Sequence, residues 1–488
     1  MKSLADSEAT IPAAAERLIA GWTALAKRWD PVVLIVAVSG LLVLPLVWFR
    51  GFNSDDGVAL TLAQTAITDG QWLTPHMFNL RFAERPVLLS WVIALISLPF
   101  GGVTEFTARL PIILSLLGGC LLIFALLRRV VSAPAALFGV ALFLACPLVV
   151  RAYVAVTADL PLAVLLFLGF YVWWIGLAAA RLTIGRWSAI GCILALAALL
   201  KGPQPVAYFF LGVGAYIAVR RSWPQLPGLI LAGVICVIPV AAWYAYVYTP
   251  GDESTWALFM RLDKVRSATL PHPLRAAANV FAETLPASLL AGVYLLTGGG
   301  RRGGQTLSDF VLALACYAFV CTIALLFWPG GEAARYFFPM VLPLCVLGGL
   351  AFDSLSVRRP LFVASVLLGT LGILAYAAVY SAIASPLLAT QFRSSKIDAA
   401  RIMERVRAAP APIYRAGPAA LNEFSYLPVR VATVDMRTLD ALRGPAWIVA
   451  QTPEADELLA KRKGALHLVL AFGRPQQLRL LRLDDDRR

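Results

Sequence analysis

The stretch from residue 31 to residue 49 reads PVVLIVAVSGLLVLPLVWF and carries no charge. A helix of about 20 apolar residues is long enough to cross the hydrocarbon core of a bilayer. More such runs follow, and the chain of 488 residues is 60% hydrophobic and only 14% charged, with a mean hydropathy of +0.76. This composition excludes a soluble enzyme and a disordered chain, and the continuous runs exclude the alternating strands of an outer-membrane barrel. The sequence predicts an all-α polytopic membrane protein.

The topology follows from arginines that separate the apolar runs. They lie at Arg128-Arg129, Arg181/Arg186, Arg220-Arg221, Arg301-Arg302 and Arg358-Arg359. If all of them face the cytoplasm, as the positive-inside rule favours, eleven helices cross the membrane and the C-terminus lies outside. The predicted spans are 31–49, 110–127, 131–150, 160–180, 186–200, 204–219, 227–248, 284–299, 307–328, 337–354 and 361–383.

Three segments lie outside these spans. Residues 1–30 are expected to form a cytoplasmic N-terminus without a cleavable signal, and Ala13 to Trp29 is amphipathic, as expected of a helix on the inner membrane surface. A large outer loop, about residues 50–109, contains the run Val87 to Phe100, which is too short to cross and is expected at the interface. Residues 384–488 predict a small outer α/β domain, with strands at Pro412–Tyr414, Trp447–Ala450 and Leu466–Leu470 and a helix at Glu454–Arg462.

The net charge and the cysteines point to no further partner. The charge of +14 arises from 42 basic and 28 acidic residues, and the positive-inside rule accounts for it without nucleic acid. The seven cysteines all lie in apolar segments, without a CxxC pair, and we interpret them as small core residues.

An acidic pair, Asp55 and Asp56, directly follows the first span. Carboxylates at a membrane boundary are costly to desolvate, so one of them is a candidate general base with a raised pKa. The alternative is a cap on a helix that begins near Gly57, because Asp and Asn are favoured there.

Two further positions combine charge with apolar surroundings. In Glu84-Arg85-Pro86 the guanidinium is suited to bidentate phosphate binding, and a surface ion pair is the alternative. Asp159 lies where one span ends and the next begins. An ionisable residue so close to lipid is a functional candidate, although with Pro161 it also fits a helix cap.

Cations on the outer face oppose the positive-inside bias. Lys201, in Leu199-Leu200-Lys201-Gly202-Pro203, is a lone cation there, which indicates anion binding; the alternative is snorkelling to lipid headgroups. Glu332, Arg335 and Tyr336 form a further outer cluster.

A histidine-rich metal site is excluded because the chain has only three histidines. Glu84 and His272 are weak candidates for a shared metal, and a loop position without a ligand role is the alternative for His272.

The order of these motifs resembles a known family. The acidic pair is followed by Gly70-Gln71-Trp72-Leu73-Thr74-Pro75-His76, Glu84-Arg85-Pro86, Glu105-Phe106-Thr107-Ala108-Arg109-Leu110-Pro111, Lys201-Gly202-Pro203 and Arg335-Tyr336. Over about residues 30–383 this order is similar to the membrane glycosyltransferases of the aminoarabinose-transferase and protein-O-mannosyltransferase type. The resemblance implies a GT-C fold and transfer of a hexose or pentose from a polyprenyl (undecaprenyl) phosphate carrier at the periplasmic face of a bacterial inner membrane.

The resemblance also implies roles for residues. Asp55 matches the catalytic acid of the family's first outer loop, Asp56 stands where many members have Glu, and Asp159 matches the acid of the second outer connection. Glu84-Arg85 matches a Glu-Lys pair, and Lys201 the lysine of the Lys-Gly-Pro turn. This chain departs from the family at Arg85, at Val58-Ala59 in place of Arg-Tyr, and at Phe82 in place of tyrosine.

The implied chemistry agrees with the residues. A polyprenyl phosphate leaving group needs cations, and Arg85, Lys201 and Arg335 are suited to bind it, while Asp55 acts on the acceptor. Asp159 is the second catalytic candidate, with Asp56, Glu84 and Tyr336 supporting. A divalent metal is compatible with this scheme but not required. The expected acceptor is an envelope lipid such as lipid A or a glycan, with protein as the alternative.

Two hypotheses come from other classes. A transporter or lipid flippase places ionisable residues near the bilayer midplane, often in repeated halves, whereas these span centres are almost free of charge and show no repeat. A non-catalytic scaffold that presents the C-terminal domain leaves the ordered acidic and basic motifs unexplained.

Overall fold

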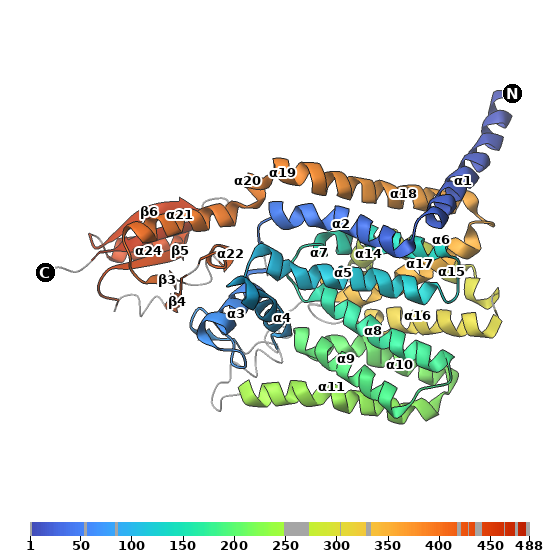
Figure 1. The fold of residues 1–488 in the computed structure, drawn as a ribbon, viewed down its shortest axis with the longest axis horizontal. Helices are drawn as coiled ribbons and strands as arrows, with labels where there is room; N and C mark the ends of the chain where they lie inside the picture. The colour runs from blue at the N-terminus through green and yellow to red at the C-terminus, as the bar shows by residue number, and fades with distance from the viewer. Residues whose placement is uncertain are drawn as a thin grey trace.

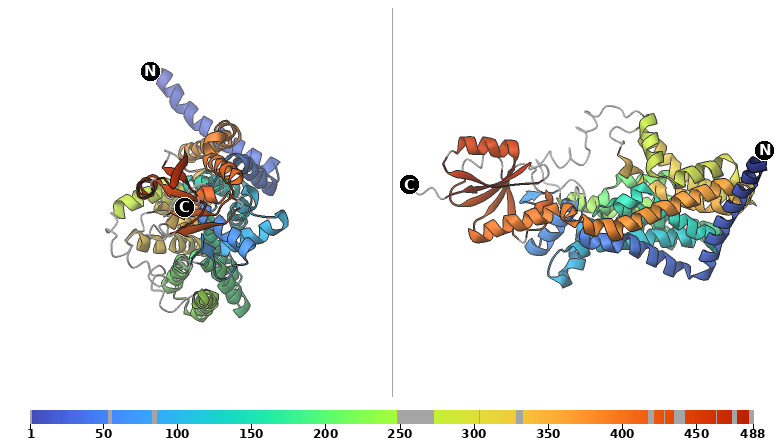
Figure 2. Two further views of the ribbon diagram at one scale, coloured as in Figure 1. Left: turned by 90° about the vertical axis from the view of Figure 1, so that its left-hand side faces the viewer. Right: turned by 90° about the horizontal axis from the view of Figure 1, so that it is seen from above.

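The computed structural model describes most of the chain. The described residues are 2–52, 56–82, 86–247, 273–302, 304–327, 333–416, 421–427, 429–434, 442–462, 464–473 and 477–484. Long helices lie side by side in a bundle, and the C-terminal α/β domain projects from one end of it, opposite the N-terminus (Figure 1). The same separation is visible from above in Figure 2.

The bundle contains the predicted apolar segments as helices. Its helices are α2 (Pro31–Phe49), α5 (Glu105–Leu127), α6 (Ala133–Ala145), α7 (Pro147–Ala152), α8 (Asp159–Ala178), α9 (Ile184–Lys201), α10 (Ala207–Arg220), α11 (Leu226–Val247), α14 (Pro273–Glu283), α15 (Ala287–Leu296), α16 (Gly304–Leu326), α17 (Val341–Leu355) and α18 (Pro360–Val379). Their starts follow local signals. At α2, for example, the Asp30 carboxylate accepts from the backbone N–H groups of Val32 and Val33, at 2.9 and 3.1 Å.

The predicted number of eleven spans exceeds what helix length supports. Among the described residues, eight helices are long and apolar enough to cross a membrane, or nine if the pair α14 and α15, bent by 108°, is one span. The predicted span 131–150 is broken at Cys146, whose extended backbone precedes Pro147, because a residue before proline disfavours the helical region. Pro203 and Pro205 likewise leave α10 with 14 residues. Which end faces the cytoplasm stays a prediction.

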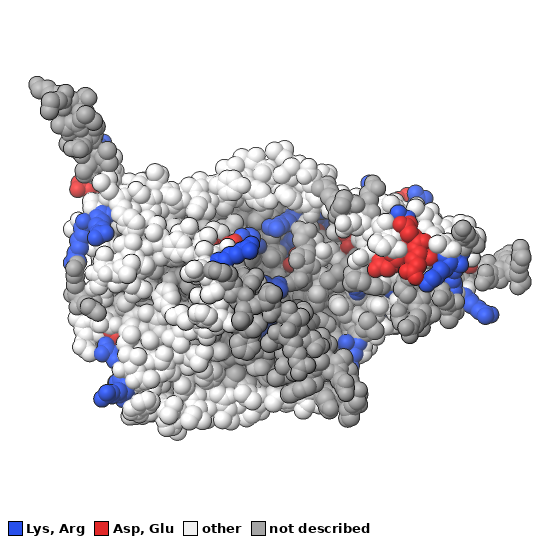
Figure 3. Space-filling view, turned by 180° about the vertical axis from the view of Figure 1, so that it is seen from behind, with Lys and Arg blue, Asp and Glu red and all other residues white. Residues whose placement is uncertain are grey.

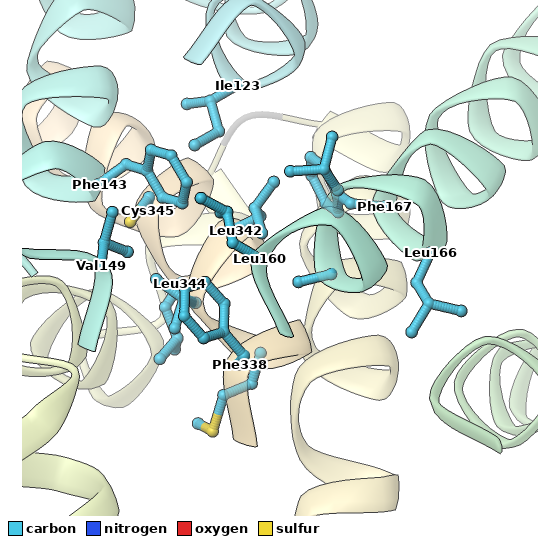
Figure 4. Packing of buried hydrophobic residues seen from close by; sticks show 14 of the residues in the cluster. Ile123, Phe143, Val149, Leu160, Leu166, Phe167, Phe338, Leu342, Leu344 and Cys345 are labelled. Carbon is cyan, nitrogen blue, oxygen red and sulfur yellow. The ribbon is translucent and has the colours of Figure 1, made fainter. Parts of the chain in front are cut away.

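The centre of the bundle is α17, which is buried almost throughout and packs against α5, α6, α15 and α16. Figure 4 shows aromatic and aliphatic side chains from several helices converging there. Small residues allow the closest approach: a Cβ added at Gly349 would lie 2.6 Å from the Leu127 side chain and 3.0 Å from the backbone oxygen of Ala135. In lipid, such van der Waals packing is a main source of helix association.

The other bundle predictions have mixed outcomes. The run predicted at the interface is a helix of ten residues, α4 (Leu88–Ser97), and is too short to cross a membrane. The amphipathic N-terminus forms α1 (Lys2–Arg28), and its Trp22 side chain donates to the backbone oxygen of Pro134 at 2.9 Å. Six cysteines are buried as expected, but Cys192 on α9 is exposed, so one of the seven is not a core residue.

The C-terminal domain contains helices and a five-stranded sheet, so the predicted α/β composition is confirmed. Its sheet has the order β4-β3-β5-β7-β6, in which β4, β3 and β5 are parallel and β7 is antiparallel to both neighbours. Helix α21 packs on one face and α24 on the other. The elements are α21 (Ser394–Ala408), β3 (Ile413–Ala416), α22 (Leu421–Phe424), β4 (Val431–Val434), β5 (Ala446–Gln451), α24 (Thr452–Lys461), β6 (Leu466–Phe472) and β7 (Leu478–Leu483).

Candidate active site

Asp159 and Lys201 meet at the end of the bundle that faces the C-terminal domain. Asp159 is the first residue of α8 and Lys201 the last of α9, and their side chains form an ion pair. Both are largely buried, with 9% and 14% of the side chain exposed. The N-terminus of α8 favours the carboxylate and the C-terminus of α9 favours the ammonium group, so each helix end stabilises the charge it carries.

A second cation joins this pair around one aromatic ring. The Lys201 ammonium lies 5.1 Å and the Arg335 guanidinium 5.7 Å from the centroid of the Tyr336 ring. Arg335 and Tyr336 belong to a short 3₁₀ segment, Ala334–Met340, that leads into α17. Cations within about 6 Å of a tyrosine ring are attracted by its π face, so Tyr336 holds two positive charges close together.

These charges line a cavity of about 50 Å³. Its polar wall is formed by Asp159, Lys201 and Arg335, and its apolar wall comes largely from α3 (Asp56–Asp69), α4 and the chain before α4. The apolar side chains include Val58, Leu62, Phe82, Val87 and Leu89. The cavity therefore joins a wall of charged side chains to an apolar wall.

Asp56 joins the start of α3 to the segment that carries Asp159. It is the first residue of α3, is 5% exposed, and its Oδ1 accepts from the backbone N–H of Val156 at 2.7 Å. Val156 lies three residues before Asp159 and also lines the cavity. The connection that leads into α3 and the connection that leads into α8, both predicted to lie on the outer face, are therefore in contact through this hydrogen bond.

Arg109 also joins the chain at the end of α2 to the chain that leads into α8. Its side chain is fully buried in α5, and its guanidinium donates to the backbone oxygens of Val47, Gly51 and Val154 at 2.7, 3.1 and 3.2 Å. It also lies 5.1 Å from the centre of the Phe52 ring. The sequence motif contains Arg109 but does not reveal this role. The motif places a guanidinium next to an apolar run, where an unpaired charge costs free energy, and this could have indicated a buried and paired arginine.

The chain is similar to known proteins in sequence and in fold. A family model of dolichyl-phosphate-mannose-protein mannosyltransferases matches residues 84–246. An undecaprenyl phosphate-α-4-amino-4-deoxy-L-arabinose arabinosyl transferase of Pseudomonas fluorescens is 24% identical over 345 residues, which cover 68% of this chain and 58% of that protein. The crystal structure of ArnT from Cupriavidus metallidurans bound to undecaprenyl phosphate has a TM-score of 0.74 at 20% identity, covering 92% of this chain and 97% of that one.

The chain therefore has the GT-C fold of ArnT and is similar in sequence to these transferases. The apo structure of the same ArnT gives a TM-score of 0.70 at 21% identity, with the same coverage. The GT-C chain spans somewhat under three fifths of the length of the Pseudomonas relative.

The GT-C site contains part of the predicted residue set. Asp56, Asp159, Lys201, Arg335 and Tyr336 are described and lie at one end of the bundle. The predicted residues Asp55, Glu84, Arg85, His272 and Glu332 lie outside the described residues. Within the described part of the chain, no three His, Cys, Asp or Glu residues are placed to hold a metal ion, and the suggested Glu84–His272 pair falls outside it.

Charges at the surface of this GT-C protein are unevenly placed. On the face in Figure 3, uncharged surface separates the basic side chains near the N-terminal end from a mixed basic and acidic group near the middle of the molecule. Two acids also lie at the basic end: Arg220 of α10 pairs with Asp309 of α16, and the Ser132 hydroxyl donates to Asp353 at 3.0 Å. An apolar belt between two charged zones is expected of a protein that crosses a membrane.

Proposed function

We propose that this protein transfers a sugar from a polyprenyl phosphate to an envelope lipid or glycan at the periplasmic face of a bacterial inner membrane. The observation that carries the proposal is the convergence of Lys201, Arg335 and Asp159 on a cavity with an apolar wall. A phosphate attached to a long prenyl chain combines the two chemistries that this cavity offers. The name of the Pseudomonas relative and the undecaprenyl phosphate bound to ArnT support the same donor class.

In the proposed reaction, the bond between the sugar's anomeric carbon and the phosphate oxygen breaks, and an acceptor oxygen bonds to that carbon. Negative charge builds on the departing phosphate, and Lys201 and Arg335 stabilise it at the cavity wall. Arg85 is a third cation for this role. The proton of the acceptor hydroxyl passes to a carboxylate, for which Asp55 is the first candidate and Asp56 the supporting residue.

Asp159 has a double part in this scheme. In the structure its carboxylate neutralises Lys201, which keeps a buried cation paired while no phosphate is bound. An incoming phosphate offers Lys201 a second anionic partner. The position of Asp159 in the cavity wall also makes it a second catalytic candidate.

The proposed placement in the membrane has three parts. Residues 1–30 are cytoplasmic, residues 31–383 form the catalytic membrane domain, and residues 384–488 form a periplasmic domain. The position of α3, α4 and the C-terminal domain at the same end of the bundle supports this arrangement, because the candidate site lies there too (Figure 1).

The test is sugar transfer by the full chain in proteoliposomes supplied with an undecaprenyl phosphate-linked sugar and lipid A. We expect release of undecaprenyl phosphate to match the gain in glycosylated lipid A, and an Asp55→Asn variant to stay folded and lose transfer. Coupled flux of a solute or lipid without any transfer would instead indicate a transporter or flippase. Mass spectrometry of envelope lipids and glycoproteins from cells with and without the protein distinguishes a lipid acceptor from a protein acceptor.

A further inference from the structure

The C-terminal domain is packed directly onto the segment between α2 and α5. Phe78 of that segment is 5% exposed and inserts into the domain's core, where it meets Phe424 edge to face at 5.5 Å. Two backbone hydrogen bonds join the same surfaces, from Thr433 to the oxygen of Phe78 at 2.9 Å and from Gly51 to the oxygen of Phe392 at 3.1 Å. The C-terminal domain therefore contacts the membrane domain directly, in addition to its covalent link to α18.

Tyr426 contacts Phe52, which precedes the acidic pair Asp55-Asp56 in the sequence. Its hydroxyl accepts from the backbone N–H of Phe52 at 2.9 Å and donates to the carboxylate of Glu105 at 3.0 Å. Its ring stacks on the Phe52 ring, with centroids 4.9 Å apart. Burial, and next the nearby Glu105 charge, raise the pKa of Tyr426, so its hydroxyl keeps the proton that it donates.

Glu105 is the residue of the membrane domain that accepts the Tyr426 hydrogen bond. It is the first residue of α5, has 14% of its side chain exposed, and also receives Lys396 and Arg393 of the C-terminal domain at 3.0 and 3.1 Å. One turn further along α5, Arg109 donates to the oxygen of Gly51. A single helix therefore carries both the group that orders Tyr426 and the group that holds the chain next to Phe52.

Phe52 is consequently held from two sides, three residues before Asp55 in the sequence. Tyr426 holds its amide and stacks on its ring, and Arg109 lies against the ring at 5.1 Å. Phe52 is four residues before Asp56, whose carboxylate contacts the Asp159 segment through Val156. Asp55 lies between these two anchored positions in the sequence.

We infer that Tyr426 is a positioning residue, through which the C-terminal domain sets the position of Phe52, and so of the acidic pair Asp55-Asp56, by joining the Phe52 amide to the Glu105 carboxylate. This inference rests on the proposed function, because it assigns Asp55 and Asp56 a part in sugar transfer. It predicts an effect on turnover without an effect on donor binding, since the cations Lys201 and Arg335 lie outside this network.

The test compares Tyr426→Phe with Tyr414→Phe in the full-length protein in proteoliposomes. Phenylalanine at 426 keeps the ring but removes the hydroxyl that joins Phe52 to Glu105. Tyr414 lies on β3 of the same domain, and its ring packs against the core on the other face of the sheet, so it is a matched control. Hydrogen exchange of peptides that cover residues 50–58 reports on this segment independently of activity, and kinetics with an undecaprenyl phosphate-linked sugar report on catalysis.

We expect Tyr426→Phe to speed exchange in residues 50–58 and to lower kcat about five- to tenfold, with donor KM unchanged and the unfolding temperature close to that of Tyr414→Phe. Unchanged exchange in this segment, unchanged kcat, or a loss of kcat that follows a fall in unfolding temperature would overturn the inference. Absence of sugar transfer in the unsubstituted protein would overturn the proposed function, and the exchange result would still decide whether Tyr426 positions residues 50–58.

Discussion

The carboxylate of Asp159 and the ammonium group of Lys201 form an ion pair between the start of α8 and the end of α9. The pair lies in the wall of the cavity to which we assign the donor phosphate. An anion that enters this cavity competes with Asp159 for the same cation. The two residues are therefore expected to affect donor binding in opposite directions, which provides a pair of kinetic tests.

Replacing Lys201 with alanine removes the paired cation. A hydrogen bond to a charged group contributes about 1.5–3 kcal/mol, so we expect the KM for the polyprenyl-phosphate donor to rise about tenfold to a hundredfold. Lys201→Arg retains the charge, so we expect its donor KM to lie between those of the unsubstituted protein and Lys201→Ala. Initial rates over a range of donor concentrations measure this, and Lys461→Ala, at an exposed surface pair with Glu457, is the control. An unchanged donor KM in Lys201→Ala would remove Lys201 from donor binding.

Replacing Asp159 with asparagine has the opposite effect on the donor. The amide keeps the shape of the side chain but no longer neutralises Lys201, so the cation is free to bind phosphate more tightly. We expect an equal or lower donor KM together with a lower kcat, because Lys201 loses the carboxylate that orients it. The same initial-rate series provides the measurement. A donor KM raised as far as in Lys201→Ala would show that Asp159 does not compete with the phosphate.

Arg109→Ala should be among the most destabilising single changes near the site. It leaves the backbone oxygens of Val47, Gly51 and Val154 without their donor in a buried place, and we expect a loss of about 3 kcal/mol or more. Thermal unfolding in detergent at one fixed scan rate detects it as a lower unfolding temperature. Arg128→Ala is the control, because Arg128 is exposed and donates to Val131 at the surface. Similar unfolding temperatures for the two variants would contradict the assigned role of Arg109.

The sequence predicts the elements of this fold well where local pattern decides them. An apolar run that follows a capping residue, such as Asp30 before α2, predicts a helix by itself. The length of the apolar run likewise predicts that α4 is too short to cross a membrane. The strands β3, β5 and β6 likewise follow from their own residues. The helix breaks at Pro147 and Pro203 could also be predicted from the sequence, because proline restricts the backbone of the residue before it. The spans predicted from the charge pattern alone ignored these prolines and were therefore too long.

The site was predictable as a set of charges on one face but not as a network. Asp159 and Lys201 are 42 residues apart, and Tyr426 and Glu105 are 321 residues apart. Which carboxylate faces which cation depends on how α8, α9 and α5 pack and on where the C-terminal domain lies. Tyr426 sits in a segment without a charge pattern or motif, so only the tertiary contact reveals that it reaches Phe52.

Glu423 makes the stability of the C-terminal domain depend on pH. It is 8% exposed on α22, and burial raises its pKa, although a hydrogen bond from the Ser395 hydroxyl at 2.9 Å opposes this. The folded domain therefore binds this proton more tightly than the unfolded chain does. The favourable contribution is complete below the unfolded pKa of about 4.5 and is lost as the pH rises through the higher folded value.

Glutamine at this position stays neutral and still accepts the Ser395 hydrogen bond. We therefore expect Glu423→Gln to raise the unfolding temperature by about 2 °C near pH 7 and to leave it unchanged near pH 4, where Glu423 itself is protonated. Thermal unfolding of both proteins in a buffer series from pH 4 to pH 8 checks this. Glu457→Gln, at an exposed position on α24, controls for the change in net charge. A constant difference between Glu423→Gln and the unsubstituted protein across the series would show that Glu423 does not titrate on folding.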